Sequence, residues 1–379
     1  MTYDCIVLGI GGAGSAALYQ VARRGMSVLG LDRFPVGHDR GSSHGDTRII
    51  RKAYYEHPDY VPLLLRAYEL WKDLETHSGK RIYTQTGLLE VGSPSGDFIR
   101  GILRSSREHS LALEELDSAE VKARFDGFRV PDGAVGLYEH DAGYLAVEEG
   151  VQTFVDEAVK HGAETRTNEV VLGWEASDEN VTVRTDQGEY AAARLIVTAG
   201  SWASSFLHDL GVPLVVLRKP LFWYQTTRDC YQLGQGAPGF FYEVLSADGT
   251  CDTYYGFPEI DAKGLKVAEH SRGEVVSDPL TVNREIDPGD RRRVETFLGQ
   301  HLPAVSTSCQ HHVICMYTCS PDHHFIVDRH PESPSVVFAA GLSGHGYKFT
   351  SVLGEVLADL AFEGKTALPI DFLSVGRFG

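Results

Sequence analysis

The sequence has no apolar run as long as a membrane-spanning helix needs, and its N-terminal residues show no basic stretch before a cleavable apolar one. Its six cysteines follow no regular spacing along 379 residues, which excludes a disulfide framework and favours a reducing compartment. Basic residues are in deficit, since 35 Lys and Arg against 52 Asp and Glu give a formal net charge of −17. This charge argues against nucleic acid and anionic membrane as partners. We therefore expect a cytoplasmic protein that binds small molecules.

A metal-binding motif is also absent. The histidine pairs at 311–312 and 323–324 each consist of neighbours, which point to opposite faces of a strand and cannot chelate together. The nearby Cys309, Cys315 and Asp322 make no recognised zinc spacing. We expect no metal site.

The clearest motif lies in the first 32 residues. An apolar stretch over 4–8 leads into Gly9-Ile10-Gly11-Gly12-Ala13-Gly14, and a helical pattern follows over 15–24. A second apolar stretch over 27–31 ends at Asp32. This order of strand, G-x-G-x-x-G, helix, strand and acid is that of the βαβ unit that binds a dinucleotide.

Each residue of this motif has a physical reason. Gly9 permits the tight turn, Gly11 lets the backbone approach a pyrophosphate, and Gly14 lets the helix pack closely on the strand. The helix N-terminus presents free N–H groups and partial positive charge to that pyrophosphate. Asp32 is placed to accept a hydrogen bond from a ribose hydroxyl.

Three later segments have patterns that resemble parts of the βαβ unit. A helix followed by a short strand at Glu169–Leu172 is expected within 145–172, and apolar strands that end in small residues are expected at 190–200 and 335–341. The last of these leads to a helix over about 350–363.

Stretches of β character over 82–92 and 214–257 separate these segments. We therefore expect an α/β fold with a Rossmann-like cofactor domain and a second domain built on a mostly antiparallel sheet. The cofactor domain would consist of residues 1–80, 145–215 and 320–379, and the second domain of residues 81–144 and 216–319.

The βαβ motif alone does not distinguish FAD from NAD, because Asp32 fits the ribose of either. The strand at 194–200, with Thr198-Ala199-Gly200, is of the kind that covers the far side of FAD in two-piece flavin folds. No second glycine loop that would serve a separate nicotinamide is found, which favours FAD and reoxidation by oxygen. The alternative is that 194–200 is an ordinary core strand.

Five longer motifs carry a resemblance to a known family. They are Gly41-Ser-Ser-His-Gly-Asp-Thr-Arg-Ile-Ile-Arg51, Tyr254-Tyr-Gly-Phe-Pro258, Gly264-Leu-Lys266, Cys315-Met-Tyr317 and Gly341-Leu-Ser-Gly-His-Gly-Tyr-Lys-Phe349. With them the chain resembles, essentially end to end, the monomeric sarcosine oxidase and N-methyltryptophan oxidase group of flavin amine oxidases. The resemblance implies an FAD-binding domain of the glutathione-reductase and D-amino-acid-oxidase type.

The resemblance also implies an activity. A secondary amino acid, N-methyl or cyclic, would be oxidised at its CH–NH bond to an imine, which water hydrolyses to aldehyde and amine. Oxygen would be reduced to hydrogen peroxide, so the partners would be a small amino acid and O2, and the enzyme would act as a monomer. The alternative is an FAD-dependent dehydrogenase that passes electrons to an acceptor other than oxygen.

Cys315 matches the cysteine that links the family's FAD to the protein through a thioether. The stretch Val313–Cys319 has the pattern of a strand, on which Cys315, Tyr317 and Cys319 share one face. The other interpretation of Cys315 is a buried core thiol, which is common in proteins.

Three basic residues match positions around the flavin ring. Lys266 matches the lysine that promotes reaction with oxygen, where a fixed cation stabilises the negative charge of superoxide. Arg48 and His44 match positions beside the ring, where positive charge favours an anionic reduced flavin. Without the resemblance, Lys266 would be read as a surface lysine.

Arg51 and Lys348 match the pair that binds the substrate carboxylate, with a guanidinium fork and a point charge. Strand geometry would separate Arg48 from Arg51, whereas a helical turn would bring them together, and the sequence does not decide between the two.

The remaining matched positions surround the substrate amine and the flavin pyrimidine. His270 and Tyr255 match residues that contact or orient the amine, and Tyr317 lines the same pocket. Gly344 and His345 match a loop that offers backbone N–H groups to the flavin.

Departures from the family pattern leave substrate identity open. Ser43 and Lys52 stand where close relatives often have histidine. The aromatic stretch 240–244, with Trp223 and Tyr224, either lines a pocket for a larger side chain or belongs to ordinary sheet core.

Overall fold

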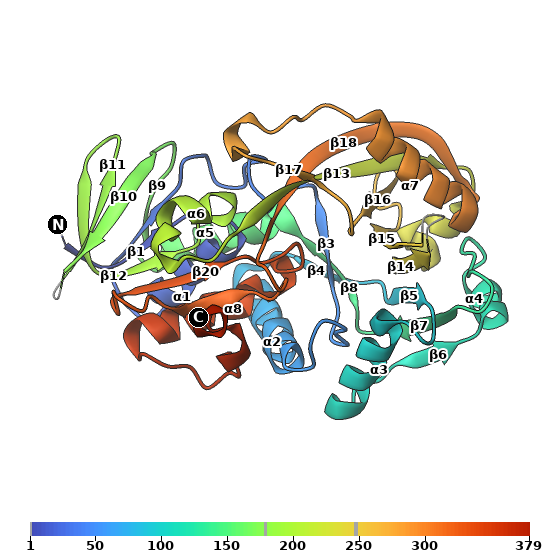
Figure 1. Cartoon of the computed structure of the whole chain (residues 1–379), viewed down its shortest axis with the longest axis horizontal. Helices are drawn as coiled ribbons and strands as arrows, with labels where there is room; N and C mark the ends of the chain where they lie inside the picture. The colour runs from blue at the N-terminus through green and yellow to red at the C-terminus, as the bar shows by residue number, and fades with distance from the viewer. Residues whose placement is uncertain (1, 178–179, 246–248) are drawn as a thin grey trace.

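The computed structural model describes residues 2–177, 180–245 and 249–379. Two large sheets lie toward opposite ends of its long axis, and a small sheet lies between them (Figure 1). No helix in these three ranges has the length and apolar character to cross a membrane.

The first sheet has eight strands and contains the βαβ unit. Its path runs β10-β11-β12-β1-β2-β9, with β20 paired to the C-terminal residues of β12, beyond those that pair with β11, and β19 paired to β20. The pairs β1–β12, β1–β2, β2–β9 and β12–β20 are parallel, while β10–β11–β12 and β19–β20 are antiparallel. The bounds are β1 Thr2–Leu8, β2 Val28–Leu31, β9 Glu164–Arg166, β10 Val171–Ala176, β11 Val181–Thr185, β12 Glu189–Val197, β19 Ile326–Arg329 and β20 Val336–Ala340.

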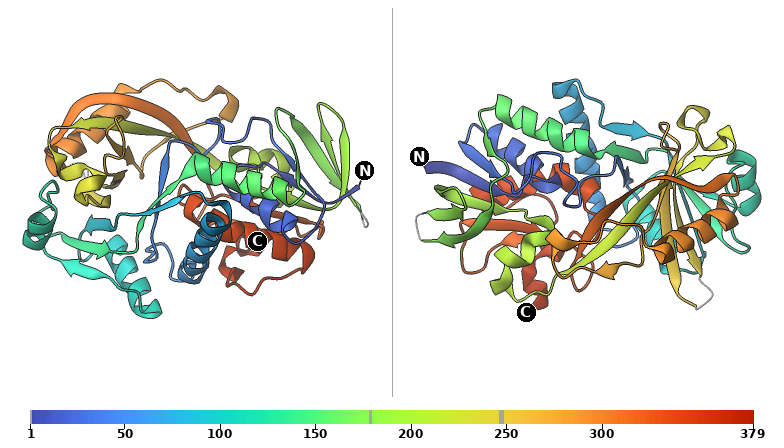
Figure 2. Two further views of the ribbon diagram at one scale, coloured as in Figure 1. Left: turned by 180° about the vertical axis from the view of Figure 1, so that it is seen from behind. Right: turned by 90° about the horizontal axis from the view of Figure 1, so that it is seen from above.

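Helices cover one face of this sheet because alternate side chains of its apolar strands point to opposite sides. Cys5 and Val7 of β1 pack with α1, α2, α5 and α8, whereas Ile6 and Leu8 belong to a separate core on the other face. Figure 2 shows the green helix α5 beside the blue helix α1. The bounds are α1 Gly12–Ala22, α2 Tyr60–Ser78, α5 Val147–Lys160 and α8 Thr350–Phe362.

One expected strand is wrong. The strand expected at Glu169–Leu172 is replaced by two elements, the parallel strand β9 at Glu164–Arg166 and the hairpin strand β10, which begins at Val171. Asn168 between them has a φ of 57°, a left-handed conformation that ends one strand and turns the chain toward the next. The other expected strands and the three expected helices lie within a few residues of their predicted positions.

The second sheet has nine strands, and all its neighbours are antiparallel except β5 and β14. Its path runs β17-β13-β16-β15-β14-β5-β7-β6, and the long β18 pairs with β13. The bounds are β5 Leu88–Gly92, β6 Glu114–Leu116, β7 Val135–Glu139, β13 Val215–Thr226, β14 Gly239–Leu245, β15 Cys251–Phe257, β16 Leu265–Glu269, β17 Glu274–Val275 and β18 Val305–Cys319.

The two faces of this second sheet have different roles. One face packs against α7 Pro288–His301 through Phe222, Phe240 and Tyr254. The opposite face carries Phe241 and Tyr255 toward the middle of the molecule. The remaining helices are α3 Asp97–His109, α4 Ser118–Arg124 and α6 Ala203–Phe206.

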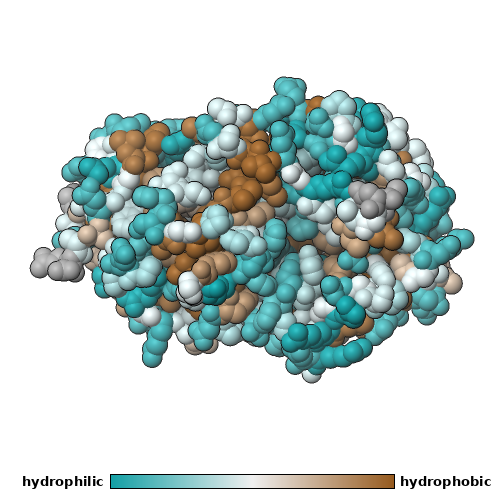
Figure 3. Space-filling model, viewed as in Figure 1, coloured by the Kyte–Doolittle hydropathy of each residue, from teal (hydrophilic) through white to brown (hydrophobic). Residues whose placement is uncertain are grey.

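A three-stranded sheet of β3 Thr47–Ile50, β8 Gly143–Ala146 and β4 Tyr83–Gln85 joins the two halves. Both large sheets therefore draw on separated pieces of the chain, while the domain boundaries themselves stay a prediction. On the face drawn in Figure 3, hydrophobic residues gather in separate patches among hydrophilic ones.

Candidate active site

A cavity of about 190 Å³ lies at the carboxyl ends of the parallel strands of the first sheet. Gly9, Gly11 and Asp32 line it near β1 and β2, and Tyr317 and Gly344 line it near the second sheet. Ligands of open α/β sheets bind at this edge, where the strands end. The place and lining of the cavity fit the dinucleotide that the motif predicts.

The glycine loop has the shape that this role needs. Gly9 has a φ of 85°, and a Cβ on Gly14 would lie 1.7 Å from the carbonyl oxygen of Gly9. Gly14 itself does not line the cavity, but its missing side chain lets α1 approach β1. At Gly11, a Cβ would meet only the Oγ of Ser43, at 3.9 Å, so the backbone is open to a ligand. The loop therefore fits a pyrophosphate.

Asp32 is buried at the end of β2 and already accepts hydrogen bonds. Its Oδ2 accepts from the Ile10 N–H and its Oδ1 from the Phe34 N–H, both at 2.9 Å. Burial raises the pKa of its carboxyl above the ordinary value, while the hydrogen bond from Phe34 opposes this. Each oxygen keeps a lone pair, so the carboxylate can also accept a ribose hydroxyl.

A second, smaller cavity of about 50 Å³ adjoins the first. Arg48, Tyr317, Gly344 and Tyr347 line both cavities and mark where they meet. Gly344 has a φ of 82°, and a Cβ there would lie 2.2 Å from the ring of Tyr317, so only glycine fits beside this tyrosine. The smaller cavity is therefore open to the end of a ligand held in the larger one.

Arg51 and Lys348 both line the smaller cavity. Lys348 donates from Nζ to the His345 carbonyl at 2.8 Å and to the Tyr54 hydroxyl at 3.2 Å. Burial and the nearby Arg51 lower the pKa of Lys348 to about 7. Two cations that line one small cavity have the chemistry to bind a carboxylate, and the role itself stays a prediction.

Arg48 and Arg51 both line the smaller cavity, although strand geometry alone would separate them. Arg48 lies within β3, while Arg51 follows the last residue of that strand, Ile50. Strand alternation no longer applies beyond Ile50, so both side chains line the smaller cavity.

His270 and Tyr317 form a hydrogen-bonded pair in the smaller cavity, with 3.1 Å between Nδ1 and the phenol oxygen. Burial, followed by the positive charge of Lys219, holds the pKa of His270 well below its ordinary value, so the imidazole is neutral. Tyr255 lines the cavity beside this pair, with its ring centroid 6.2 Å from that of His270. A neutral imidazole can accept a hydrogen bond from an amine.

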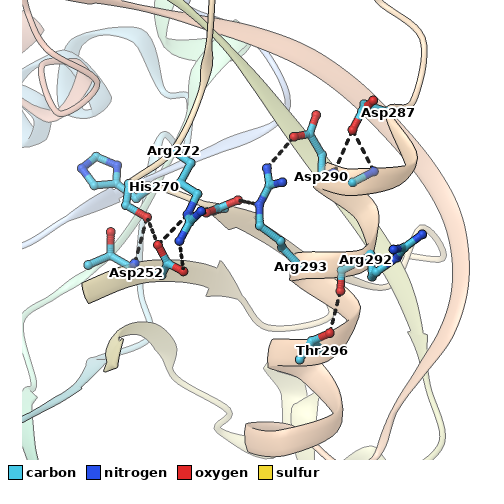
Figure 4. Close-up of polar contacts among 12 residues, drawn as sticks. Asp252, His270, Arg272, Asp287, Asp290, Arg292, Arg293 and Thr296 are labelled. Carbon is cyan, nitrogen blue, oxygen red and sulfur yellow. Dashed lines mark hydrogen bonds and ion pairs between the residues drawn. The ribbon is translucent and has the colours of Figure 1, made fainter. Parts of the chain in front are cut away.

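A network of ion pairs fixes the segment that carries His270. Asp252 pairs with Arg272 at 2.8 Å, and Glu269 pairs with Arg293 at 2.7 Å. Figure 4 shows Asp252 and Arg272 beside His270, with Arg293 beyond them, and the ring of His270 points away from all three. The network therefore anchors the backbone on both sides of His270.

Arg48, Cys315 and Lys266 lie together beside the cavities. The Nη2 atom of Arg48 donates to the Sγ of Cys315 at 3.2 Å and to the Ser42 carbonyl at 2.8 Å. Lys266 donates from Nζ to the Thr47 carbonyl at 2.8 Å, which Arg48 also binds. Burial and Arg48 lower the pKa of Lys266 well below its ordinary value.

Three of the expected flavin-contacting residues do not line either cavity. Lys266 and His44 are each 2% exposed and Cys315 is 1% exposed. Burial and Arg48 lower the pKa of His44 to about 3. Lys266 lies beneath the segment 45–47, whose Gly45 and Thr47 carbonyls it binds. Their direct contact with a flavin stays a prediction.

The aromatic stretch at 240–244 was expected either to line a pocket or to belong to the sheet core, and its residues do both. Phe241 lines the smaller cavity, whereas Phe240 and Tyr242 belong to the core under α7. Tyr224 is also in that core, and Trp223 is buried over Lys266 rather than lining the smaller cavity.

The sequence reasoning missed several charged residues. Glu56 lines the smaller cavity, Glu90 contacts Arg51, and Lys219 lies under Tyr317 with its Nζ 4.7 Å from the ring centroid. A signal did exist for Glu90, because it interrupts the apolar run of β5. Within the described ranges, no group of three or more His, Cys, Asp or Glu side chains could hold a metal ion.

The Rossmann-like sheet, its glycine loop and the cavity along it define a dinucleotide-binding enzyme with a substrate cavity at one end. Residues 4–360 match the family model described as DAO, FAD dependent oxidoreductase. The chain therefore belongs to the family of FAD-dependent oxidoreductases.

Relatives confirm the resemblance seen in the sequence. Monomeric sarcosine oxidase of Bacillus sp. (strain NS-129) is 39% identical over 99% of this chain and 97% of its own. N-methyl-L-tryptophan oxidase of Citrobacter koseri is 37% identical over the full length of both chains. Among solved structures, the open form of NikD, an unusual amino acid oxidase essential for nikkomycin biosynthesis, has a TM-score of 0.85 and 25% identity, covering 98% of this chain and 97% of that one.

The pKa of Lys348 predicts a pH dependence of anion binding. Lys348 is cationic below about pH 7 and neutral above it, so the affinity of the FAD-loaded enzyme for acetate should fall as the pH rises through that value. Titrations that follow the flavin absorbance between about pH 6 and about pH 8.5 measure this. Lys348→Met should bind acetate weakly throughout and lose the part of the fall that is centred near pH 7. Wild-type affinity that is constant over the range would contradict the assignment.

Proposed function

We propose that the protein is an FAD-dependent oxidase of a secondary amino acid, N-methyl or cyclic, that reduces O2 to hydrogen peroxide. The observation that supports this proposal is the meeting of the two cavities: Arg51 and Lys348, which we propose bind the substrate carboxylate, line the smaller cavity, and that cavity adjoins the one that fits a dinucleotide. The names of the two curated relatives support the N-methyl amino acid.

The chain's own residues bind and orient the substrate in this proposal. Arg51 and Lys348 bind its carboxylate, and the neutral His270 accepts a hydrogen bond from its amine, because burial and Lys219 keep that ring uncharged. Tyr317 holds His270 through the hydrogen bond at Nδ1. FAD, when bound, accepts two electrons from the carbon–nitrogen bond and passes them to oxygen.

The overall reaction balances. The amine loses two electrons and two protons to become an imine, and O2 gains both pairs to become hydrogen peroxide. Water then adds to the imine and releases an aldehyde and an amine, or opens the ring of a cyclic substrate.

A monomer in the cytoplasm is the simplest setting for this activity. The name of the Bacillus relative supports a monomer. The six cysteines are all unpaired, which supports a reducing compartment.

The activity predicts peroxide from a panel of secondary amino acids. Sarcosine, N-methyltryptophan, proline and pipecolate should be tested, and at least one should give equal amounts of oxygen consumed and peroxide formed. An oxygen electrode and a peroxidase-coupled assay measure the two. Catalytic silence across the panel and related N-methyl amino acids would contradict the proposal.

One observation favours the second candidate, a dehydrogenase that uses another acceptor. The Nζ of Lys266 is bound by protein oxygens and lines neither cavity, so a direct path from this cation to oxygen is not visible. A wild-type enzyme that substrate reduces without air and that then reacts slowly with air would favour this candidate.

The oxidase proposal predicts a selective loss in Lys266→Met. Loss of the cation should slow the reaction of the reduced enzyme with O2 by roughly 10²-fold or more, because the negative charge of the reduced oxygen is no longer stabilised. Reduction by substrate should change much less, and anaerobic stopped-flow separates the two steps. Lys263→Met is the matched control, since Lys263 is three residues away and 40% exposed. Unimpaired reoxidation of Lys266→Met would remove the assignment.

We propose further that FAD is attached through a thioether at Cys315, whose sulfur Arg48 binds beside both cavities. Acid precipitation of the wild type should leave the yellow colour in the pellet, and a flavin-modified peptide should contain Cys315. Cys315→Ala should release its flavin into the supernatant. Cys319→Ala, on the same strand face, should keep it bound. Colour that stays with Cys315→Ala would contradict the linkage.

A further inference from the structure

Only one nitrogen of the Arg51 guanidinium, Nη1, makes a hydrogen bond among the described residues. Its Nη1 donates to Oε1 of Glu90 in a close contact, while Nη2 lies 3.5 Å from Oε2 of Glu56. Its Nε has no hydrogen-bond partner among the described residues. The Nε and Nη2 atoms form the edge that binds a carboxylate through two parallel hydrogen bonds.

Glu90 is the most deeply buried of the carboxyl groups around this arginine. It lies in the middle of β5 and is 0% exposed, paired with Phe241 of β14 and Leu137 of β7. Its strand neighbours Leu89 and Val91 belong to the core under α7, so strand alternation directs Glu90 to the cavity side of the sheet.

Glu90 and Glu56 differ in how firmly they hold Arg51. Glu56 lines the smaller cavity, its side chain is 13% exposed, and its contact with Arg51 is long. Glu90 is enclosed by the sheet and lines neither cavity. A ligand can therefore displace Glu56 from the guanidinium, but it cannot reach Glu90.

A carboxylate beside a carboxylate-binding arginine would cancel the charge that the substrate needs. Burial raises the pKa of Glu90 to about 8, although Arg51 opposes this, and the nearby Glu139 raises it further. Burial therefore favours the protonated form of Glu90, in which its carbonyl oxygen accepts from Nη1 without offsetting the charge of Arg51.

We propose that Glu90 is a positioning residue for substrate binding: it holds Nη1 of Arg51 from behind the cavity, so that the Nε and Nη2 edge faces the substrate carboxylate. This rests on the proposed function, in which Arg51 binds that carboxylate. The positioning contact is the hydrogen bond from Nη1 to Oε1 of Glu90, and glutamine, which keeps a carbonyl oxygen at that position, can replace it.

The test compares Glu90→Gln with Glu90→Leu in the FAD-loaded enzyme. The ligand is methoxyacetate, an isostere of sarcosine with an ether oxygen in place of the N–H, followed through the flavin absorbance. Glu90→Leu should weaken its binding about tenfold or more, because Arg51 loses its anchor, whereas Glu90→Gln should stay within about threefold of the wild type. With a substrate that turns over, Glu90→Leu should raise KM by a similar factor and change kcat by less than about threefold.

Glu169→Gln is the matched control, since Glu169 is a buried carboxyl, 1% exposed, that lines neither cavity. It should leave methoxyacetate binding unchanged, and flavin content and thermal unfolding of each variant show whether the fold is kept. Wild-type binding by Glu90→Leu would overturn the proposal, and so would equal losses in Glu90→Gln and Glu90→Leu. A wild type that neither binds methoxyacetate nor oxidises any secondary amino acid would instead contradict the proposed function.

Discussion

The alternation of side chains along the strands of the second sheet decides which residues line the smaller cavity and which belong to the core under α7. Tyr254 packs under α7 and Tyr255 lines the smaller cavity, and Phe240 and Phe241 divide in the same way. A shift of one residue in the pairing of β14 with β15 would exchange these faces and bury the cavity residues in the core. The apolar face against α7 thus fixes the register, and the register fixes the site.

Charge burial is the second constraint. Arg51, Lys266 and Lys348 are almost fully buried, and an uncompensated buried cation is strongly unfavourable. The contacts are of two kinds, since Arg51 contacts carboxyl groups whereas Lys266 and Lys348 donate to backbone carbonyls and hydroxyls. Carbonyl oxygens carry no full charge, so Lys348 remains available to an incoming anion, and its lowered pKa reflects the same burial.

The sequence predicted the parts that depend on local patterns. The glycine loop and Asp32 lie where the βαβ pattern places them, because strand, turn and helix signals agree within 32 residues. The strand at Glu169–Leu172 was wrong because a single left-handed residue, Asn168, moved the break. Glu90 and Lys219 were missed because their partners lie far away in the sequence, and no local pattern indicates that such a contact forms. The roles assigned to Lys266 and Cys315 came from the resemblance and not from any residue pattern.

The contact between Tyr317 and Gly344 connects the larger cavity, which fits the dinucleotide, with the smaller cavity. Tyr317 lines both cavities and binds His270, and its ring lies where any side chain on Gly344 would stand. A ligand that orders the loop around Gly344 from the cofactor side therefore also fixes the ring that orients His270 on the substrate side. The same loop continues to Lys348, so a residue that lines the larger cavity, Gly344, and a cation that lines the smaller one lie on a single short segment of backbone. His270 lies elsewhere in the chain and is connected to this segment only through Tyr317. Because interior packing is tight, the loop around Gly344 and the ring of Tyr317 cannot shift independently, so a change in the lining of one cavity alters the lining of the other.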